Sequence, residues 1–398
     1  MDLTITPRLL RGEITAIPSK SMAHRMLICA AFSQEPTNLI CPTTNQDIEA
    51  TAQCLEALGI CIERRRWEYH VSPVNRIPEM AVLNCHESGS TLRFLLPIVG
   101  ALGINTTFKM EGRLPQRPLS PLWEEMERMG CKLKYISENE LECSGKLRSG
   151  EYFIYGSVSS QFISGLLFAT SLMDSDSKII IIGNLESAPY VTMTQKVMEL
   201  FGVNTDNFYI KGGQQYHSPG TITVEGDWSN GAFFLAAKAL GNTVEIKGLS
   251  PDSEQGDRAA EQLLPALSQN ITVSAADIPD LIPILSVVAA ANQGAVFTDI
   301  QRLRLKESDR VASVIAMIQA LGGKAEQTES TLTVFGTGLT GGTVDAHRDH
   351  RIAMSAAIAA TVCTEPVTIM GAECVIKSYP SFWDEYKKLG GHYEQYLR

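Results

Sequence analysis

The chain has 398 residues, and its 34 Lys and Arg against 44 Asp and Glu give a formal net charge of −10. Hydrophobic residues make up 44% and charged residues 20%, which is the composition of a folded globular protein and excludes a disordered chain. At roughly 150 residues per domain this length predicts two domains, and the acidic balance disfavours a general binder of nucleic acid or anionic membranes, because phosphate contacts need a basic face.

The cysteines indicate a reducing compartment. Their number is odd, their spacing is scattered and no C-x-x-C pair occurs, so neither a disulfide framework nor a zinc site is expected. The N-terminus lacks the layout of a signal peptide, and the best apolar run, residues 281–291, is shorter than the roughly 18 residues of a membrane span. We therefore expect a cytoplasmic protein with free thiols at Cys29, Cys41, Cys54, Cys61, Cys85, Cys131, Cys143, Cys363 and Cys374.

A recurring helix end divides the chain into similar segments. Expected helices stop at an apolar residue followed by glycine, at Gly59, Gly130, Gly202, Gly322 and Gly390. Glycine there adopts the left-handed conformation that ends a helix at low steric cost. Most intervals are about 70 residues, and the longer one fits two shorter units if a helix also ends at 268–270. The pattern predicts six units.

Each unit is expected to contain strands and two kinds of helix. Alternating residues predict hairpins at 131–136 with 141–144 and at 324–327 with 331–336. Charged helices such as 123–129 should lie outside, whereas helices that are apolar nearly all round should be buried. The apolar helices are expected at 26–32, 92–102, 162–172, 233–240, 281–291 and 352–362. We predict an α/β protein with two domains of three units and a crossover near 220–227.

The first apolar helix opens with basic and hydroxyl residues. Ser19 or Ser21 can cap it, and Ser21 lies on the same face as Arg25. Lys20 in the first turn opposes the positive end of the helix dipole, a conflict that a bound anion would remove. A solvated lysine beside a surface arginine is the alternative interpretation.

Two later helix starts repeat this arrangement. Gly89 permits close backbone approach and Arg93 follows it at the start of an apolar helix. Residues 157–161 open the third helix with hydroxyls and an amide, which suit phosphate or sugar-like hydroxyl groups. One serine-rich start is usually only a cap, but three in parallel positions favour a binding surface.

The second half places dense charge before apolar helices, at 302–310 and 345–351. Solvated ion-pair clusters are the alternative for both stretches. A metal site is disfavoured because neighbouring arginines would repel a cation; its ligands would be Asp345, His347, Asp349 and His350.

Seven cations stand at expected helix starts. This grouping predicts a site for a small polyanion, because arginine pairs bidentately with carboxylate and phosphate. These cations are Lys20, Arg25, Arg93, Arg117, Arg310, Arg351 and Lys377. Binding alone would not need Asp280, which stands in an apolar stretch, or Glu307, which lies among Lys306, Arg304 and Arg310. Acids in such settings suit proton transfer.

In these residues the chain resembles the 5-enolpyruvylshikimate-3-phosphate synthase family of enolpyruvyl transferases. The matches run nearly end to end: Ser19-Lys20-Ser21 with Arg25, Gly89 with Arg93, Arg117-Pro118, Ser159-Ser160-Gln161, Ser187 with Tyr190, Gly226-Asp227, Pro279-Asp280, Lys306-Glu307-Ser308-Asp309-Arg310, Asp349-His350-Arg351 and Lys377. Most are weak singly, but in this order they are specific.

The resemblance implies two domains, each of three β-α-β-α-β-β units with inward helices that point at an interdomain cleft. Residues 1–13 with 227–398 would form a discontinuous domain with phosphoenolpyruvate and catalytic residues, and 14–226 the domain with most shikimate 3-phosphate contacts. It also implies transfer of the enolpyruvyl group of phosphoenolpyruvate to the 5-hydroxyl of shikimate 3-phosphate, with release of phosphate. No metal or organic cofactor is implied, and the two domains are expected to close on their substrates.

Site residues follow by position from the same resemblance. The implied shikimate 3-phosphate contacts are Lys20, Ser21, Arg25, Ser159, Ser160, Gln161, Ser187, Tyr190, Asp280 and Lys306. The implied phosphoenolpyruvate contacts are Lys20, Gly89, Arg93, Arg117, Gln161, Glu307, Arg310, Arg351 and Lys377. Asp280 would accept the proton of the attacking 5-hydroxyl, Glu307 would deliver a proton to C3, and Lys20 would protonate the leaving phosphate.

Two positions depart from the family pattern and leave affinity and glyphosate sensitivity open. Glu87 stands where many members have Asn, and Arg302 replaces a small or amide residue.

Three other functions use a related fold or a similar set of arginines. The related transferase acting on UDP-N-acetylglucosamine carries a reactive loop Cys, which residues 111–120 lack. RNA 3′-phosphate cyclase shares the repeat but would need a reactive His and a basic surface. A non-catalytic polyanion-binding protein would keep the arginines without the two acids. We expect a monomer that acts on small molecules, without nucleic-acid or membrane partners.

Overall fold

The computed structural model describes residues 1–73 and 76–396, so 397–398, which close the predicted range 227–398, lie outside the described residues. The chain divides into two compact units: unit 1 contains Met1–Ile17 with Glu225–Arg398, and unit 2 contains Pro18–Val224. The first crossing follows residue 17 rather than residue 13 because β2 (Arg11–Thr15) pairs along its length with β14 (Thr243–Lys247) of unit 1.

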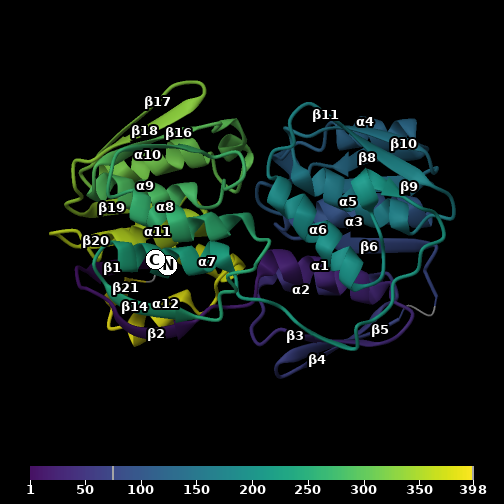
Figure 1. The fold of residues 1–398 in the computed structure, drawn as a ribbon, viewed down its shortest axis with the longest axis horizontal. Coiled ribbons are helices and arrows are strands. Elements are labelled where there is room, and N and C mark those ends of the chain that lie inside the picture. The colour runs from purple at the N-terminus through teal and green to yellow at the C-terminus, as the bar shows by residue number, and fades with distance from the viewer. Residues whose placement is uncertain (74–75, 397–398) are drawn as a thin grey trace. The chain divides into compact units, whose positions relative to one another are not determined.

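Unit 2 is built from three sheets (Figure 1). In two of them a parallel pair continues into an antiparallel hairpin; the third has the same parallel pair and one short antiparallel strand. The sheet orders are β13 (Thr221–Thr223), β3 (Thr37–Ile40), β5 (Glu68–Ser72), β4 (Cys61–Arg65); β6 (Met80–Asn84), β7 (Asn105–Lys109), β9 (Glu140–Gly145), β8 (Cys131–Ser137); and β10 (Glu151–Tyr155), β11 (Ser177–Ile182), β12 (Tyr209–Ile210).

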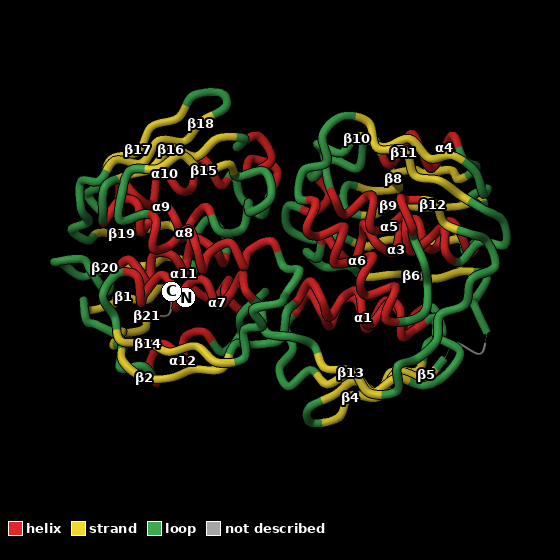
Figure 2. Tube along the Cα trace, viewed as in Figure 1, coloured by secondary structure: helices red, strands yellow, loops and turns green. Residues whose placement is uncertain are grey.

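The centre of unit 2 is helical, with the sheets around it (Figure 2). Inner helices α1 (Lys20–Ala31), α3 (Gly89–Leu102) and α5 (Ser160–Ser171) bury most of their residues. Their apolar bodies leave no polar face for water, so burial is the state that removes this surface from solvent. The outer helices are α2 (Gln46–Ala57), α4 (Leu122–Arg128) and α6 (Ala188–Leu200).

Unit 1 repeats the plan. Its sheets are β19 (Gly342–Asp345), β20 (Val367–Met370), β1 (Asp2–Thr6), β21 (His392–Tyr396); β15 (Ile271–Ser274), β16 (Gly294–Thr298), β18 (Thr331–Phe335), β17 (Lys324–Gln327); and the pair β14–β2. The buried helices are α7 (Trp228–Ala239), α9 (Ile282–Ala291) and α11 (His350–Ala359). The outer helices are α8 (Ala260–Ala266), α10 (Arg310–Ala320) and α12 (Phe382–Lys388).

Short 3₁₀ helices join these elements: η1 (Leu114–Gln116), η2 (Asp206–Phe208), η3 (Gly256–Ala259), η4 (Gln301–Leu305) and η5 (Ala372–Lys377). In unit 1, β1 pairs with both β20 and β21, so the N-terminal strand completes a sheet made from the C-terminal part of the chain.

The predicted repeat and fold class are confirmed. The stop glycines have positive φ, from 81° at Gly202 to 118° at Gly130. The six sheets correspond to six units, and the hairpins β8–β9 and β17–β18 are present. The units are less equal than expected, because β10–β11–β12 and β14–β2 lack the full four strands.

All nine cysteines are free, and most are buried in the two apolar cores. Within residues 1–73 and 76–396, none of the helices combines the length and apolar character needed to cross a bilayer.

Candidate active site

Lys20 begins α1, behind a capping serine. The Met22 amide donates to Ser19 Oγ at 3.4 Å, so Ser19 rather than Ser21 is the cap. Lys20 Nζ lies 2.8 Å from Oδ2 of Asp47, an acid in the first turn of α2 that the sequence interpretation did not include. The carboxylate offsets the unfavourable position of the lysine at a positive helix end.

Arg25 is a buried guanidinium held by neutral oxygens. It donates to Thr194 Oγ1 (2.8 Å), to the Ser21 carbonyl (2.7 Å) and to the Tyr190 carbonyl (2.9 Å), and it lies over the Phe94 ring at 5.0 Å. Burial lowers the pKa of Arg25 to about 10. Ser21, Arg25, Tyr190 and Thr194 form what we call the Arg25 cluster, which joins three of the predicted shikimate 3-phosphate residues.

Arg93 and Arg117 converge on Gly89. A Cβ placed on Gly89 would lie 2.7 Å from Nη1 of each arginine, so glycine is the residue that leaves room for both. Arg93 Nη1 donates to Gln161 Oε1 at 3.2 Å, and Gln161 Nε2 donates to Ser90 Oγ at 2.9 Å. Gly89, Arg93, Arg117 and Gln161, which we call the Gly89 cluster, thus come together from α3, α5 and the residue that follows η1.

The remaining predicted hydroxyls of unit 2 lie at helix starts. Ser159 is the extended N-cap of α5 and its side chain makes no capping bond, while Ser160 is buried. Ser187 precedes α6 in a left-handed conformation with φ 56°. Such a conformation is uncommon for a residue with a Cβ and is found where the surroundings impose it.

Arg310 organises the corresponding region of unit 1. Its Nε lies 2.9 Å from Asp349, its Nη1 2.5 Å from Asp280 and its Nη2 2.8 Å from Glu307. Burial disfavours the charged arginine, but the three carboxylates outweigh that cost and hold the pKa of Arg310 well above its usual value. We call Asp280, Lys306, Glu307, Arg310, Asp349 and Arg351 the Arg310 cluster.

Asp280 faces three cations. Besides Arg310, Arg351 Nη2 lies 3.4 Å and Lys306 Nζ 3.6 Å from its carboxylate oxygens. Burial by itself would raise the pKa of Asp280, but Lys306, Arg310 and Arg351 hold it well below the ordinary value. Burial, together with the charges of Arg310 and Arg302, lowers the pKa of Lys306 to about 8, although Asp280 opposes this shift.

Arg304, which the sequence places close to Glu307, has described partners on other residues. It pairs with Asp309 at 3.4 Å and donates to Gln327 at 2.8 Å, whereas Glu307 pairs with Arg310. A 3₁₀ helix, η4, carries Arg304, and strand β17 supplies Gln327, a pairing that local sequence does not reveal.

Lys377 is buried at the end of η5, and its neighbour Ser378 accepts a hydrogen bond from Asn230 of α7 at 3.2 Å. The disfavoured metal site is not assembled, since Asp349 caps α11 and pairs with Arg310, and no metal-binding group of His, Cys, Asp or Glu occurs within the described ranges.

The family model for EPSP synthase (3-phosphoshikimate 1-carboxyvinyltransferase) matches residues 5–278 and 262–386. The chain belongs to this family.

Relatives in the EPSP synthase family cover nearly the whole chain. A 3-phosphoshikimate 1-carboxyvinyltransferase of Clostridium kluyveri is 38% identical over 99% of this chain and 98% of its own length, and one of Clostridium perfringens (strain ATCC 13124) is 39% identical over 97% and 98%. The solved structure of EPSP synthase from Acinetobacter baumannii shares the fold, with a TM-score of 0.80, 21% identity and coverage of 99% of this chain and all of that one.

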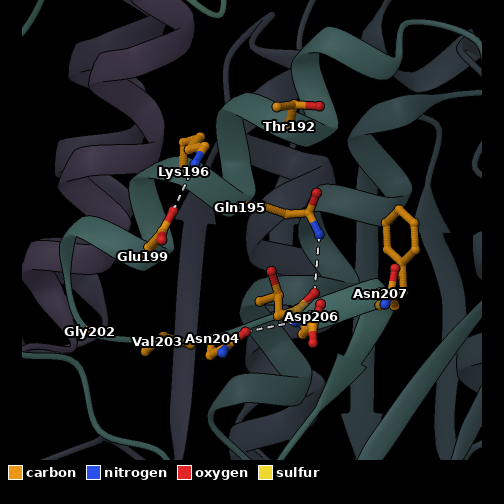
Figure 3. A pocket seen from close by; sticks show the side chains of 11 residues that line it. Thr192, Gln195, Lys196, Glu199, Gly202, Val203, Asn204, Asp206 and Asn207 are labelled. Carbon is orange, nitrogen blue, oxygen red and sulfur yellow. Dashed lines mark hydrogen bonds and ion pairs between the residues drawn. The ribbon is translucent and has the colours of Figure 1, made fainter.

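A separate pocket of about 460 Å³ lies on the outer side of α6 in this EPSP synthase family member (Figure 3). Gln195 Nε2 donates to the Thr205 carbonyl at 3.2 Å across it, and Lys196 pairs with Glu199 at 3.1 Å. None of the predicted site residues lines this pocket.

Sequence reasoning missed Asp47 and Thr194, and it named Asp349 without its pairing to Arg310. An acid in the first turn of a helix is ordinarily a partner of the helix dipole, so Asp47 had no distinguishing local signal. Asp349 stood in a charged stretch that was considered for metal binding, and its pairing with Arg310 joins residues 39 positions apart.

Proposed function

We propose that this chain transfers the enolpyruvyl group of phosphoenolpyruvate to the 5-hydroxyl of shikimate 3-phosphate and releases phosphate, the activity for which its family is named. The observation that carries the proposal is the position of Arg310, which contacts both Asp280 and Glu307 through one guanidinium. Two acids so held are suited to moving protons at neighbouring atoms of one substrate pair.

The clusters of unit 2 supply anion binding. The Arg25 cluster, with Ser159, Ser160 and Ser187, is assigned to shikimate 3-phosphate. Arg25 supports this assignment because its described acceptors are all neutral, so its charge is available to a phosphate. The Gly89 cluster is assigned to phosphoenolpyruvate, with Arg310, Arg351 and Lys377 of unit 1, and Lys20 is assigned to both substrates.

The reaction follows as addition and elimination. O5 of shikimate 3-phosphate attacks C2 of phosphoenolpyruvate, Asp280 takes the O5 proton, and Glu307 donates a proton to C3. The C2–O bond to phosphate then breaks and Lys20 protonates the departing phosphate. Glu307, left as a carboxylate by the addition step, takes a proton back from C3 as the double bond is restored. Each positioned proton transfer is worth roughly 10²–10⁴-fold in rate. The proposed chemistry needs no cofactor.

The cations around Asp280 make it a weak base before substrates bind. Arg310 and Arg351 are both assigned to phosphoenolpyruvate, so the substrate carboxylate shares their charge. Less positive charge then acts on Asp280, and its affinity for a proton rises. The binding of phosphoenolpyruvate therefore strengthens the base that acts on the other substrate, shikimate 3-phosphate.

The decisive experiment measures inorganic phosphate released from phosphoenolpyruvate by the purified chain. We expect release that depends on shikimate 3-phosphate and does not occur with UDP-N-acetylglucosamine as acceptor. Release with the nucleotide sugar, or no release with either acceptor, would overturn the proposal. Size-exclusion chromatography with light scattering tests the accompanying proposal of a monomer, and cell fractionation tests a cytoplasmic location.

A further inference from the structure

Asp257 is a buried carboxylate that the sequence interpretation did not assign. It lies in η3 and only 1% of it is exposed. Ser229 Oγ, from the first turn of α7, donates to its Oδ2. Its other oxygen, Oδ1, is buried without a hydrogen-bond partner among the described residues. A carboxylate left half satisfied in the interior is costly, so its retention calls for a role.

A continuous chain of contacts leads from Asp257 to the proposed base. The Ser229 side chain meets Asp257, and the Ser229 carbonyl accepts a hydrogen bond from Arg351 Nη1 at 2.9 Å. The other terminal nitrogen, Nη2, of Arg351 lies 3.4 Å from Asp280 Oδ2. Arg351 therefore lies between two carboxylates, in contact with Asp280 and linked to Asp257 through one serine.

Four groups from three other elements face Asp257. α7 contributes Ser229 and its N-cap Asp227, the loop before α9 contributes Asp280, and α11 contributes Arg351. Burial, then the charge of Asp280, raises the pKa of Asp257 to about 7, against the opposing charge of Arg351. Its charge therefore changes near neutral pH.

We propose that Asp257 is a positioning residue that competes with Asp280 for Arg351 and so sets how strongly that arginine neutralises the proposed base. The proposal rests on the function proposed above. With Asp257 protonated, Arg351 is drawn to Asp280 alone and weakens it as a base. With Asp257 ionised, Arg351 is shared and a second negative charge lies nearby, so Asp280 takes up a proton more readily.

The test compares pH profiles of kcat and of KM for both substrates between pH 5.5 and 8.5. In the unmodified protein we expect kcat to rise through pH 7. Asp257→Asn keeps the shape of the side chain but cannot ionise. Its kcat should match that of the unmodified protein at pH 6 and be about tenfold lower at pH 8, which is the effect of one pKa unit in the base. Neither KM should change by more than about twofold. Ser229→Ala, which removes the link but leaves Asp257 in place, should reduce the same rise. Asp252→Asn, an exposed acid five residues away, is the matched control and should not differ.

A second measurement does not depend on activity. The folded protein retains a proton on Asp257 from about pH 4 to pH 7 that the unfolded chain has released, so stability due to this group falls as pH rises through that window. Asp257→Asn should therefore melt at a higher temperature than the unmodified protein at pH 8 and at the same temperature near pH 4.5.

The outcomes separate the two proposals. Loss of all phosphate release in the unmodified protein would reject the proposed function. An active unmodified protein whose Asp257→Asn variant is slowed equally at every pH would reject the positioning role alone, because a merely structural defect lowers kcat without removing a titration. Equal melting temperatures at pH 8 would reject the buried charge on which that role depends.

Discussion

Two buried arginines, Arg25 in unit 2 and Arg310 in unit 1, show opposite ways of keeping a cation in the interior. Arg25 is surrounded by a hydroxyl and two carbonyls, whereas Arg310 contacts three carboxylates. Burial correspondingly lowers the pKa of Arg25, while the carboxylates hold the pKa of Arg310 above its usual value. A cation without counter-charge is suited to recruit an anion, and one already neutralised is suited to orient the acids beside it.

The largest expected effect comes from removing the acids that Arg310 holds, to which we assign the proton transfers. Asp280→Ala and Glu307→Ala should each lower kcat by roughly a hundredfold or more, because each removes one proton transfer. Binding of shikimate 3-phosphate, measured by calorimetry, should stay nearly intact. Asp277→Ala, an exposed acid close to Asp280, is the control. Unchanged turnover in both variants would refute the assigned roles.

The next largest effect tests whether Arg25 binds an anion. Lysine retains the charge of Arg25 but not its planar set of donors, so Arg25→Lys should weaken shikimate 3-phosphate binding by roughly tenfold or more. Calorimetric titration measures this directly, and the exposed Arg65→Lys should have no effect. Equal affinity in the two variants would show that Arg25 serves the fold alone.

Gly89→Ala extends the comparison to two further arginines of unit 2, Arg93 and Arg117. The added methyl would lie 2.7 Å from both Arg93 and Arg117, so both guanidiniums must move. We expect the KM for phosphoenolpyruvate to rise by roughly tenfold, as one misplaced charged hydrogen bond would produce, with little change for shikimate 3-phosphate. Steady-state kinetics with each substrate varied in turn measures both values. A rise confined to shikimate 3-phosphate would contradict the assignment.

The smallest expected effect concerns the protonation of His24, which would add a positive charge beside the cations of unit 2. His24 is buried on α1, where its Nδ1 contacts Thr51 at 2.7 Å, and burial lowers its pKa to about 3. The unfolded chain binds this proton below about pH 6.5 and the folded one does not, so stability is lost as pH falls, by at most about 1.4 kcal/mol per pH unit. His24→Asn should reduce the drop in melting temperature between pH 7 and pH 5. The exposed His217→Asn should leave it unchanged, and a drop as steep in His24→Asn would exclude His24 as its source.

The fold was predictable from sequence because its signals are local. Glycine after an apolar residue ends a helix through its own backbone freedom, and an apolar helix has to be buried wherever it lies in the chain. The boundary near residue 13 was less accurate, because β2 belongs to unit 1 through pairing with β14, more than 200 residues away.

The candidate site was only partly predictable. The cations and hydroxyls stand at helix starts, where local composition reveals them, and clusters such as Gly89 with Arg93 then follow. The residues that contact them come from other elements: Asp47 for Lys20, Asp349 for Arg310 and Ser229 for Arg351. Nothing in a linear pattern marks an ordinary aspartate or serine as one of these partners.

The pairing of β1 with β20 and β21 has a consequence for biosynthesis. Unit 2 is one continuous stretch, Pro18–Val224, so it can collapse while the ribosome is still adding later residues. Unit 1 must wait, because the partners of its first strand, Asp2–Thr6, are translated only after the whole of unit 2. Until then that strand has no partner strand on the nascent polypeptide, and the order of synthesis makes unit 2, to which we assign the Arg25 and Gly89 clusters, the first to form.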